Sequence, residues 1–179
     1  MAKGDASLAS CHGQPVAPEP LQTCFAPVVR PDVRVLVLGS LPGAMSLAAA
    51  RYYAHPRNQF WRLMGAVIER DLEPLGYEAR LQALLDARVG LWDTVAEGRR
   101  RGSLDAAIRL ERASDLAALV SDLPALEAIG FNGSTAARVG RGQIEAGGQR
   151  LIDLPSSSPA LTWRFERKLE RWLELRAFL

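Results

Sequence analysis

The chain has 179 residues, 48% of them hydrophobic and 23% charged, which suits one compact domain with a sizeable core. No apolar run approaches the ~18 residues of a membrane span, and the N-terminus lacks the layout of a secretory signal, so we expect a cytoplasmic protein and not a membrane protein. Two cysteines and two histidines are too few for a four-thiolate zinc or iron–sulfur site within the chain. The net charge of +2 permits nucleic-acid binding but does not demand it.

The first half of the chain predicts a tail followed by strands and helices. Residues 1–30 hold four prolines and no hydrophobic period, which predicts a poorly ordered extension before a single domain over residues 31–179. Residues 35–38 form a continuous apolar run that ends at Gly39, as in a buried parallel strand. Helices are then predicted from residue 46, over 59–70 and around 81–85, and a short strand over 89–92.

The second half continues this alternation. Ser114 and Thr162 are predicted to be the N-caps of two helices, whereas the arginines at 99–101 are expected to form a solvated charge run. The order of short apolar strands and helices predicts an α/β fold, a three-layer sandwich with a short, mostly parallel central sheet flanked by helices. Its remaining elements are predicted strands over 125–131 and 151–154 and predicted helices over 116–120, over 134–139 and after residue 162.

Polar segments follow the predicted strands, and in a parallel sheet the ligand site lies beyond the carboxyl ends of the strands. Glycine, proline, serine and amide residues dominate these segments, which are uncharged apart from Asp93, His55 and Arg57. Backbone amides, hydroxyls and an aromatic face suit a flat heterocycle held by stacking and edge hydrogen bonds. The segments are residues 39–43, 52–58, 92–94, 131–133 and 155–158.

The loop Gly39-Ser40-Leu41-Pro42-Gly43 does not fit the familiar phosphate or hydrolase motifs. It lacks the lysine of a Walker loop and the spacing of a dinucleotide fingerprint. Its serine is off-centre for a serine-hydrolase elbow. On the residues alone, a tight strand-to-helix turn without a ligand remains an alternative interpretation.

Three segments, 39–43, 54–61 and 154–158, resemble the uracil-DNA glycosylase superfamily in order and spacing. The pattern is similar to that of the mismatch-specific uracil and thymine glycosylases. It is closer to the hypoxanthine-DNA (deoxyinosine) glycosylase branch, where Gly-Ser-Met/Leu-Pro-Gly is followed by Tyr-Tyr-Ala-His-Pro-Arg-Asn and Leu-Trp-Asp. The resemblance spans about residues 25–175. It implies a monofunctional DNA glycosylase of base excision repair that needs no metal or cofactor and acts as a monomer on DNA containing a deaminated base, hypoxanthine in preference to uracil.

One position departs from the mismatch enzymes, because Leu41 stands where they carry their catalytic asparagine. The hypoxanthine branch implies that the chemistry has moved to Asn58. Cleavage of an N-glycosidic bond passes through an oxocarbenium-like state, so a weak nucleophile suffices once an amide has placed the water. Asn58 also suits the N-cap of the following helix, and both roles are compatible.

The same resemblance assigns roles to the other site residues. Gly39 and Ser40 are expected to supply donors to the departing base beside Leu41, and Tyr53 to stack on that base. Asp93 is expected to accept a hydrogen bond from N1–H of hypoxanthine or N3–H of uracil, with an Asp turn as the alternative. Contacts to DNA are expected from His55, Arg57, Ser156, Ser157 and Ser158, and a wedge in the base stack from Leu161.

Other interpretations stay open at this stage. His55 can equally be a structural hydrogen-bond partner, and Asn132, in an Asn-Gly turn, is expected to be mainly architectural. A nucleoside or nucleotide N-glycoside hydrolase would use a similar pocket. The leucine at position 41 also motivates a catalytically inactive protein that binds damaged DNA.

Overall fold

The computed structural model describes residues 19–144 and 147–179. Its centre is a four-stranded sheet in the order β3-β2-β6-β7, and every pairing in this sheet is parallel. This confirms the predicted parallel sheet. Its strands are β2 (Val35–Gly39), β3 (Val89–Asp93), β6 (Ala128–Asn132) and β7 (Arg150–Leu154).

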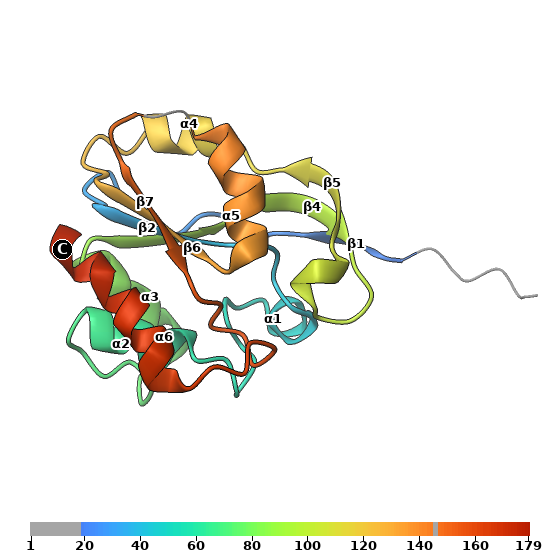
Figure 1. Ribbon diagram of the computed structural model, residues 1–179, viewed down its shortest axis with the longest axis horizontal. Coiled ribbons are helices and arrows are strands. Elements are labelled where there is room, and N and C mark those ends of the chain that lie inside the picture. Colours follow the sequence, from blue (N-terminus) through green and yellow to red (C-terminus); the bar gives the residue numbers. More distant parts are fainter. Residues whose placement is uncertain (1–18, 145–146) are drawn as a thin grey trace, which may run out of the picture.

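Helices cover both faces of this sheet, which confirms the three-layer prediction (Figure 1). Val35 and Val37 of β2 belong to the hydrophobic cluster on one face, and Leu36 and Leu38 to the cluster on the other. Because β2 is buried on both faces, its sequence is continuously apolar rather than alternating. The first face carries α2 (Phe60–Val67), α3 (Tyr77–Asp86) and α6 (Phe165–Trp172), and the second carries α4 (Leu116–Ser121) and α5 (Ser134–Gly140).

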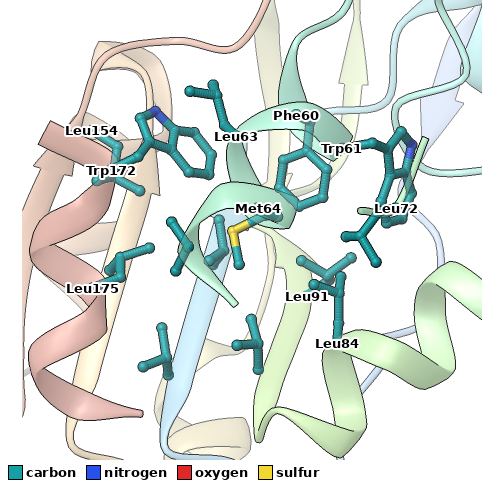
Figure 2. Packing of buried hydrophobic residues seen from close by; sticks show 14 of the residues in the cluster. Phe60, Trp61, Leu63, Met64, Leu72, Leu84, Leu91, Leu154, Trp172 and Leu175 are labelled. Carbon is teal, nitrogen blue, oxygen red and sulfur yellow. The ribbon is translucent and has the colours of Figure 1, made fainter. Parts of the chain in front are cut away.

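Aromatic packing fixes the start of α2 in this core. Figure 2 shows Phe60 and Met64 between Trp172 on one side and Trp61 on the other. The rings of Phe60 and Trp172 meet edge to face, with their centroids 5.8 Å apart. The residue pair just before α2, 58–59, is therefore held against a rigid layer.

A second sheet was not predicted. It is antiparallel, has the order β1-β4-β5, and consists of β1 (Leu21–Thr23), β4 (Val95–Arg99) and β5 (Arg109–Ala113). In Figure 1 it lies to one side of the parallel sheet. β5 is charged and mostly exposed, whereas β4 is largely buried but has only Val95 and Ala96 as a short apolar pair, so hydrophobic periodicity could not reveal either strand.

β1 also corrects the boundary of the predicted extension. Regular structure begins before residue 31, because residues 21–23 form a strand that pairs with β4. The rest of the predicted extension, residues 1–18, lies outside the described residues.

Two predicted helix caps are wrong. Asp115, not Ser114, caps α4, since its carboxylate accepts a hydrogen bond from the Ala118 amide at 3.0 Å. Thr162 caps nothing, because α6 begins three residues later with Arg164 at its N-cap position. The shorter helices are α1 (Ala44–Ala49), η1 (Asp105–Ala107), η2 (Arg141–Gln143) and η3 (Leu173–Phe178), and no helix in the described part of the chain is long and apolar enough to span a membrane.

Candidate active site

A cavity of about 350 Å³ opens at the carboxyl edge of the parallel sheet, within the size range of small-molecule sites. All five segments that the sequence placed at this edge contribute to its wall. A sixth segment, residues 103–105 between β4 and β5, was not predicted to do so. The predicted site residues that line the cavity are Gly39, Ser40, Leu41, Tyr53, His55, Arg57, Asn58, Asp93, Ser156, Ser157 and Ser158.

The floor of the cavity is formed where β2 and β3 end side by side, with Gly39 opposite Asp93. A Cβ atom on Gly39 would lie only 2.4 Å from Asp93 Oδ1 and 3.2 Å from the Tyr53 hydroxyl. Only glycine therefore leaves room for the carboxyl group to sit against the turn.

Asp93 is a buried acid without a complete set of partners. Its side chain is buried, and Oδ2 finds no hydrogen-bond partner within residues 19–144 and 147–179. Burial and the charge of Asp105 raise the pKa of Asp93 to about 7, although Arg100 opposes the shift. A buried polar atom that the protein leaves unsatisfied beside a cavity is suited to a ligand that donates a hydrogen bond.

Tyr53 forms an aromatic wall of the cavity in a strained conformation. Its φ of 52° lies in the left-handed region, which is unusual for a bulky side chain. Phe60 stacks on the ring, with centroids 3.7 Å apart and planes 10° from parallel. Asn132 Nδ2 donates to the Tyr53 hydroxyl at 3.2 Å, and burial raises the pKa of that hydroxyl, so the ring stays neutral.

The turn from His55 to Asn58 brings both side chains to the cavity. The backbone N–H of Asn58 donates to the His55 carbonyl at 2.8 Å, and the backbone N–H of Arg57 donates to His55 Nδ1 at 3.1 Å. A neutral His55 then carries its proton on Nε2, which can donate to a phosphate or a base.

Asn58 caps the start of α2 from inside this turn. Its Oδ1 accepts a hydrogen bond from the Phe60 amide at 3.0 Å, although Gln59 occupies the formal N-cap position. The bond engages one lone pair of the amide oxygen. The side-chain NH₂ group and the second lone pair of Oδ1 are then left to hold a water molecule.

The loop after β2 is held from behind by Arg100. This arginine is 1% exposed, so the prediction of a solvated charge run is wrong at this position. Its guanidinium donates to the carbonyls of Leu41 and Pro42. It also donates to Gln22 Oε1 at 3.0 Å and to Asp105 Oδ1 at 3.3 Å.

Two predicted donors have other partners. The hydroxyl of Ser40, which is buried, hydrogen-bonds to the carboxyl of Asp105 and lowers the pKa of that acid, which burial otherwise raises. Ser157 is 1% exposed, and its hydroxyl accepts from Asn132 Nδ2 at 2.9 Å while its amide donates to Asn132 Oδ1 at 2.8 Å. Neither hydroxyl is presented freely to solvent, and Asn132 has the architectural contacts expected of it.

The serine loop, residues 155–158, is fixed from below by α6. Lys168 is buried and donates through Nζ to the Ser158 carbonyl at 3.3 Å, and Trp172 donates through Nε1 to the Pro155 carbonyl at 3.0 Å. The hydroxyls of Ser156 and Ser158 accept from backbone amides two residues onward. The loop is thus a preformed rim, and no signal in the sequence marked Lys168 as its support.

Leu161 does not line this cavity. It lies along a neighbouring groove of about 780 Å³, whose walls include Trp163 and Arg167. The groove and the cavity share the side chains of Leu104, Asp105, Ser156, Ser158 and Ala160. The described residues offer no group of three His, Cys, Asp or Glu side chains placed to hold a metal ion.

A glycine turn, a stacked tyrosine and a serine rim enclose a pocket at the edge of the parallel sheet, an arrangement suited to a protein that holds a flat ring. Comparison with known proteins then identifies the family, since the pattern of the Uracil DNA glycosylase superfamily matches residues 26–177. The chain belongs to this superfamily.

Two curated relatives carry the name hypoxanthine DNA glycosylase. The protein from Methanosarcina barkeri (strain Fusaro) is 36% identical over 150 residues, which cover 84% of this chain and 94% of the relative. The protein from Methanosarcina acetivorans is 38% identical over 146 residues, which cover 82% and 91%. A solution NMR structure of a candidate uracil DNA glycosylase from M. acetivorans superposes with a TM-score of 0.77 at 34% identity, covering 89% of this chain and 99% of that one.

Proposed function

We propose that this DNA glycosylase flips a deaminated nucleotide out of DNA, prefers hypoxanthine, and hydrolyses the N-glycosidic bond to leave an abasic site. The observation that carries the proposal is the buried carboxyl of Asp93, with an unpartnered oxygen, in a cavity that Asn58 also lines. The names of the two Methanosarcina relatives support the choice of base.

Recognition of hypoxanthine rests on its N1–H donor and its neighbouring O6 acceptor. A protonated Asp93 complements both, because its carbonyl oxygen accepts from N1–H while its hydroxyl donates to O6. A pKa of about 7 makes that form abundant near neutral pH. Tyr53 supplies the stacking surface, backed by Phe60.

Hydrolysis requires a positioned water and support for the departing base. Asn58 would orient the water through its NH₂ group and its free lone pair, while the Oδ1 bond to Phe60 fixes the side chain. Negative charge that grows on the base would be met by a protonated Asp93 and by backbone amides of the loop after Gly39. Ser40 then acts by holding Asp105 rather than by touching the base.

Contacts to DNA are proposed for the cavity rim. His55, through Nε2–H, and Arg57 would donate to phosphates on one side, and Ser156 and Ser158 on the other. Ser157 would shape the loop from beneath, because its polar groups are bonded to Asn132. We further propose that the enzyme acts as a cytoplasmic monomer without a metal or cofactor.

The test is base release from oligonucleotides that carry inosine, uracil or xanthine. We expect inosine to be the fastest substrate, and Asn58→Ala to slow its release at least ~100-fold, about 2.7 kcal/mol of barrier. Asn58→Ser is the matched control, since serine keeps a cap acceptor for the Phe60 amide but lacks the amide group. Asn58→Ser should therefore have the unfolding midpoint of the wild type but the slow base release of Asn58→Ala.

Three results would overturn the proposal. Unchanged turnover in Asn58→Ala removes this residue from the chemistry. Faster hydrolysis of free deoxyinosine than of inosine in DNA identifies a nucleoside hydrolase. Tight binding to inosine DNA without base release, even at enzyme excess, identifies a binding protein, which the leucine at position 41 makes worth testing.

A further inference from the structure

An exposed leucine stands at the mouth of the cavity. Leu104 is 60% exposed, more than any other large hydrophobic side chain in the described ranges. It lines both the cavity and the neighbouring groove. The side chain therefore lies on the ridge that separates the two hollows.

The backbone that carries Leu104 is anchored on both sides. The Ser103 hydroxyl accepts from the Ala44 amide at 3.3 Å, which ties the segment to the start of α1. Asp105, the next residue, is held by the buried guanidinium of Arg100 and by the Ser40 hydroxyl. An exposed apolar side chain on a tethered backbone is presented to a partner in a defined place.

The segment after the serine loop offers no comparable side chain at the mouth of the cavity, since Trp163, which is 39% exposed, lines the groove and not the cavity. Ala160 lines both hollows but carries only a methyl group. Leu161 lines the groove alone and is half-buried, with its amide bonded to the Ser158 carbonyl at 3.2 Å. The wedge predicted at Leu161 is therefore displaced from the mouth of the cavity.

Extruding a nucleotide leaves a gap in the base stack, and the loss of stacking costs a few kcal/mol. Proteins that distort DNA fill such gaps with apolar side chains inserted between base steps. We propose that Leu104, delivered by the β4–β5 connection, enters the stack and fills the gap left by the flipped nucleotide. This inference rests on the proposed function and adds the residue that holds the flipped state open.

The test compares a paired with an unpaired substrate, because a wedge is needed only where a stack must be opened. Single-turnover base release is measured on duplex and on single-stranded inosine oligonucleotides for the wild type, Leu104→Ala and Leu161→Ala. We expect Leu104→Ala to slow release from the duplex at least ~10-fold and from the single strand less than ~2-fold. Leu161→Ala should change either rate less than ~3-fold, and Leu104→Met should restore most of the duplex rate.

Two further measurements sharpen the result. A 2-aminopurine beside the inosine reports unstacking, and its fluorescence gain on binding should be lost in Leu104→Ala. Leu110→Ala is the matched control, because this leucine is 49% exposed on β5 and lies outside the cavity and the groove. It should behave as the wild type does.

The outcomes separate the wedge from the proposed function. Equal slowing on both substrates in Leu104→Ala, or a duplex-specific loss in Leu161→Ala alone, overturns the wedge. An unchanged 2-aminopurine signal in Leu104→Ala overturns it as well. A wild type that releases no hypoxanthine from either strand defeats the proposed function instead.

Discussion

In the proposed mechanism, the protonation state of Asp93 decides what the cavity can do. Its pKa of about 7, raised by burial and by Asp105, leaves both acid and anion present near neutral pH. The acid both donates and accepts, whereas the anion only accepts and repels the negative charge that grows on the departing base. In that mechanism, Asp93 links recognition of the base to the ease with which the base leaves.

We therefore expect single-turnover release of hypoxanthine to fall as the pH rises through about 7, by up to ~10-fold per pH unit above it. The Asp93→Asn variant should lose this dependence, because its amide presents a donor and an acceptor at every pH. Rates are measured at saturating enzyme between about pH 5.5 and 8.5, a range that brackets this pKa. A wild-type rate that rises with pH, or the same profile in the variant, contradicts the assignment.

The same shift predicts how stability depends on pH. The folded protein holds the Asp93 proton up to a pKa of about 7, whereas an unperturbed aspartic acid has a pKa of 3.8. The stabilisation that this carboxyl group contributes is fully present below the lower pKa and is lost as the pH rises to the higher pKa. Relative to Asp93→Asn, the wild-type free energy of unfolding should drop by roughly 1 kcal/mol per pH unit in that window. Urea titrations of both proteins at several pH values check this, and parallel curves would refute it.

At the scale of elements, the antiparallel sheet supports the cavity from outside the parallel core. Arg100 follows β4 directly and joins three segments, since it donates to Gln22 of β1, to the carbonyls of Leu41 and Pro42, and to Asp105. A planar guanidinium can satisfy this many acceptors at once, and an ammonium group cannot. The turn after β2 therefore depends on a residue that the cavity wall does not include.

Replacing Arg100 should loosen the turn after β2 without changing the side chains that line the cavity. We expect Arg100→Lys to lower the free energy of unfolding by about 2–3 kcal/mol, because it leaves buried acceptors unpaired. It should also slow base release while leaving the substrate order of inosine, uracil and xanthine unchanged. Arg101→Lys is the control, since its side chain is 69% exposed. Equal effects of the two substitutions would show that Arg100 is not a support of the turn.

At the scale of the whole molecule, the parallel sheet and its site could be predicted because they depend on local patterns. The run at 35–38 is apolar because both of its faces are covered, and parallel strands bring their carboxyl ends to one edge. Arg100, Lys168 and Leu104 escaped prediction because their burial or exposure arises from packing between distant segments. A short charged strand such as β5 carries no periodic signal either.

Within the first thirty residues, β1 belongs to the folded domain, which the sequence did not indicate, and this assignment can be tested by truncation. β1 pairs with β4, and Gln22 accepts a hydrogen bond from Arg100, so residues 21–23 help to fix the arginine that holds the turn at the cavity. A chain that begins at Glu19 keeps these contacts and should retain the unfolding midpoint and the rate of base release. A chain that begins at Pro31 loses them, and we expect its free energy of unfolding to fall by at least ~2 kcal/mol and its rate to fall with it. Thermal unfolding and single-turnover release of both truncations decide the matter, because equal behaviour would mean that β1 contributes nothing to the site.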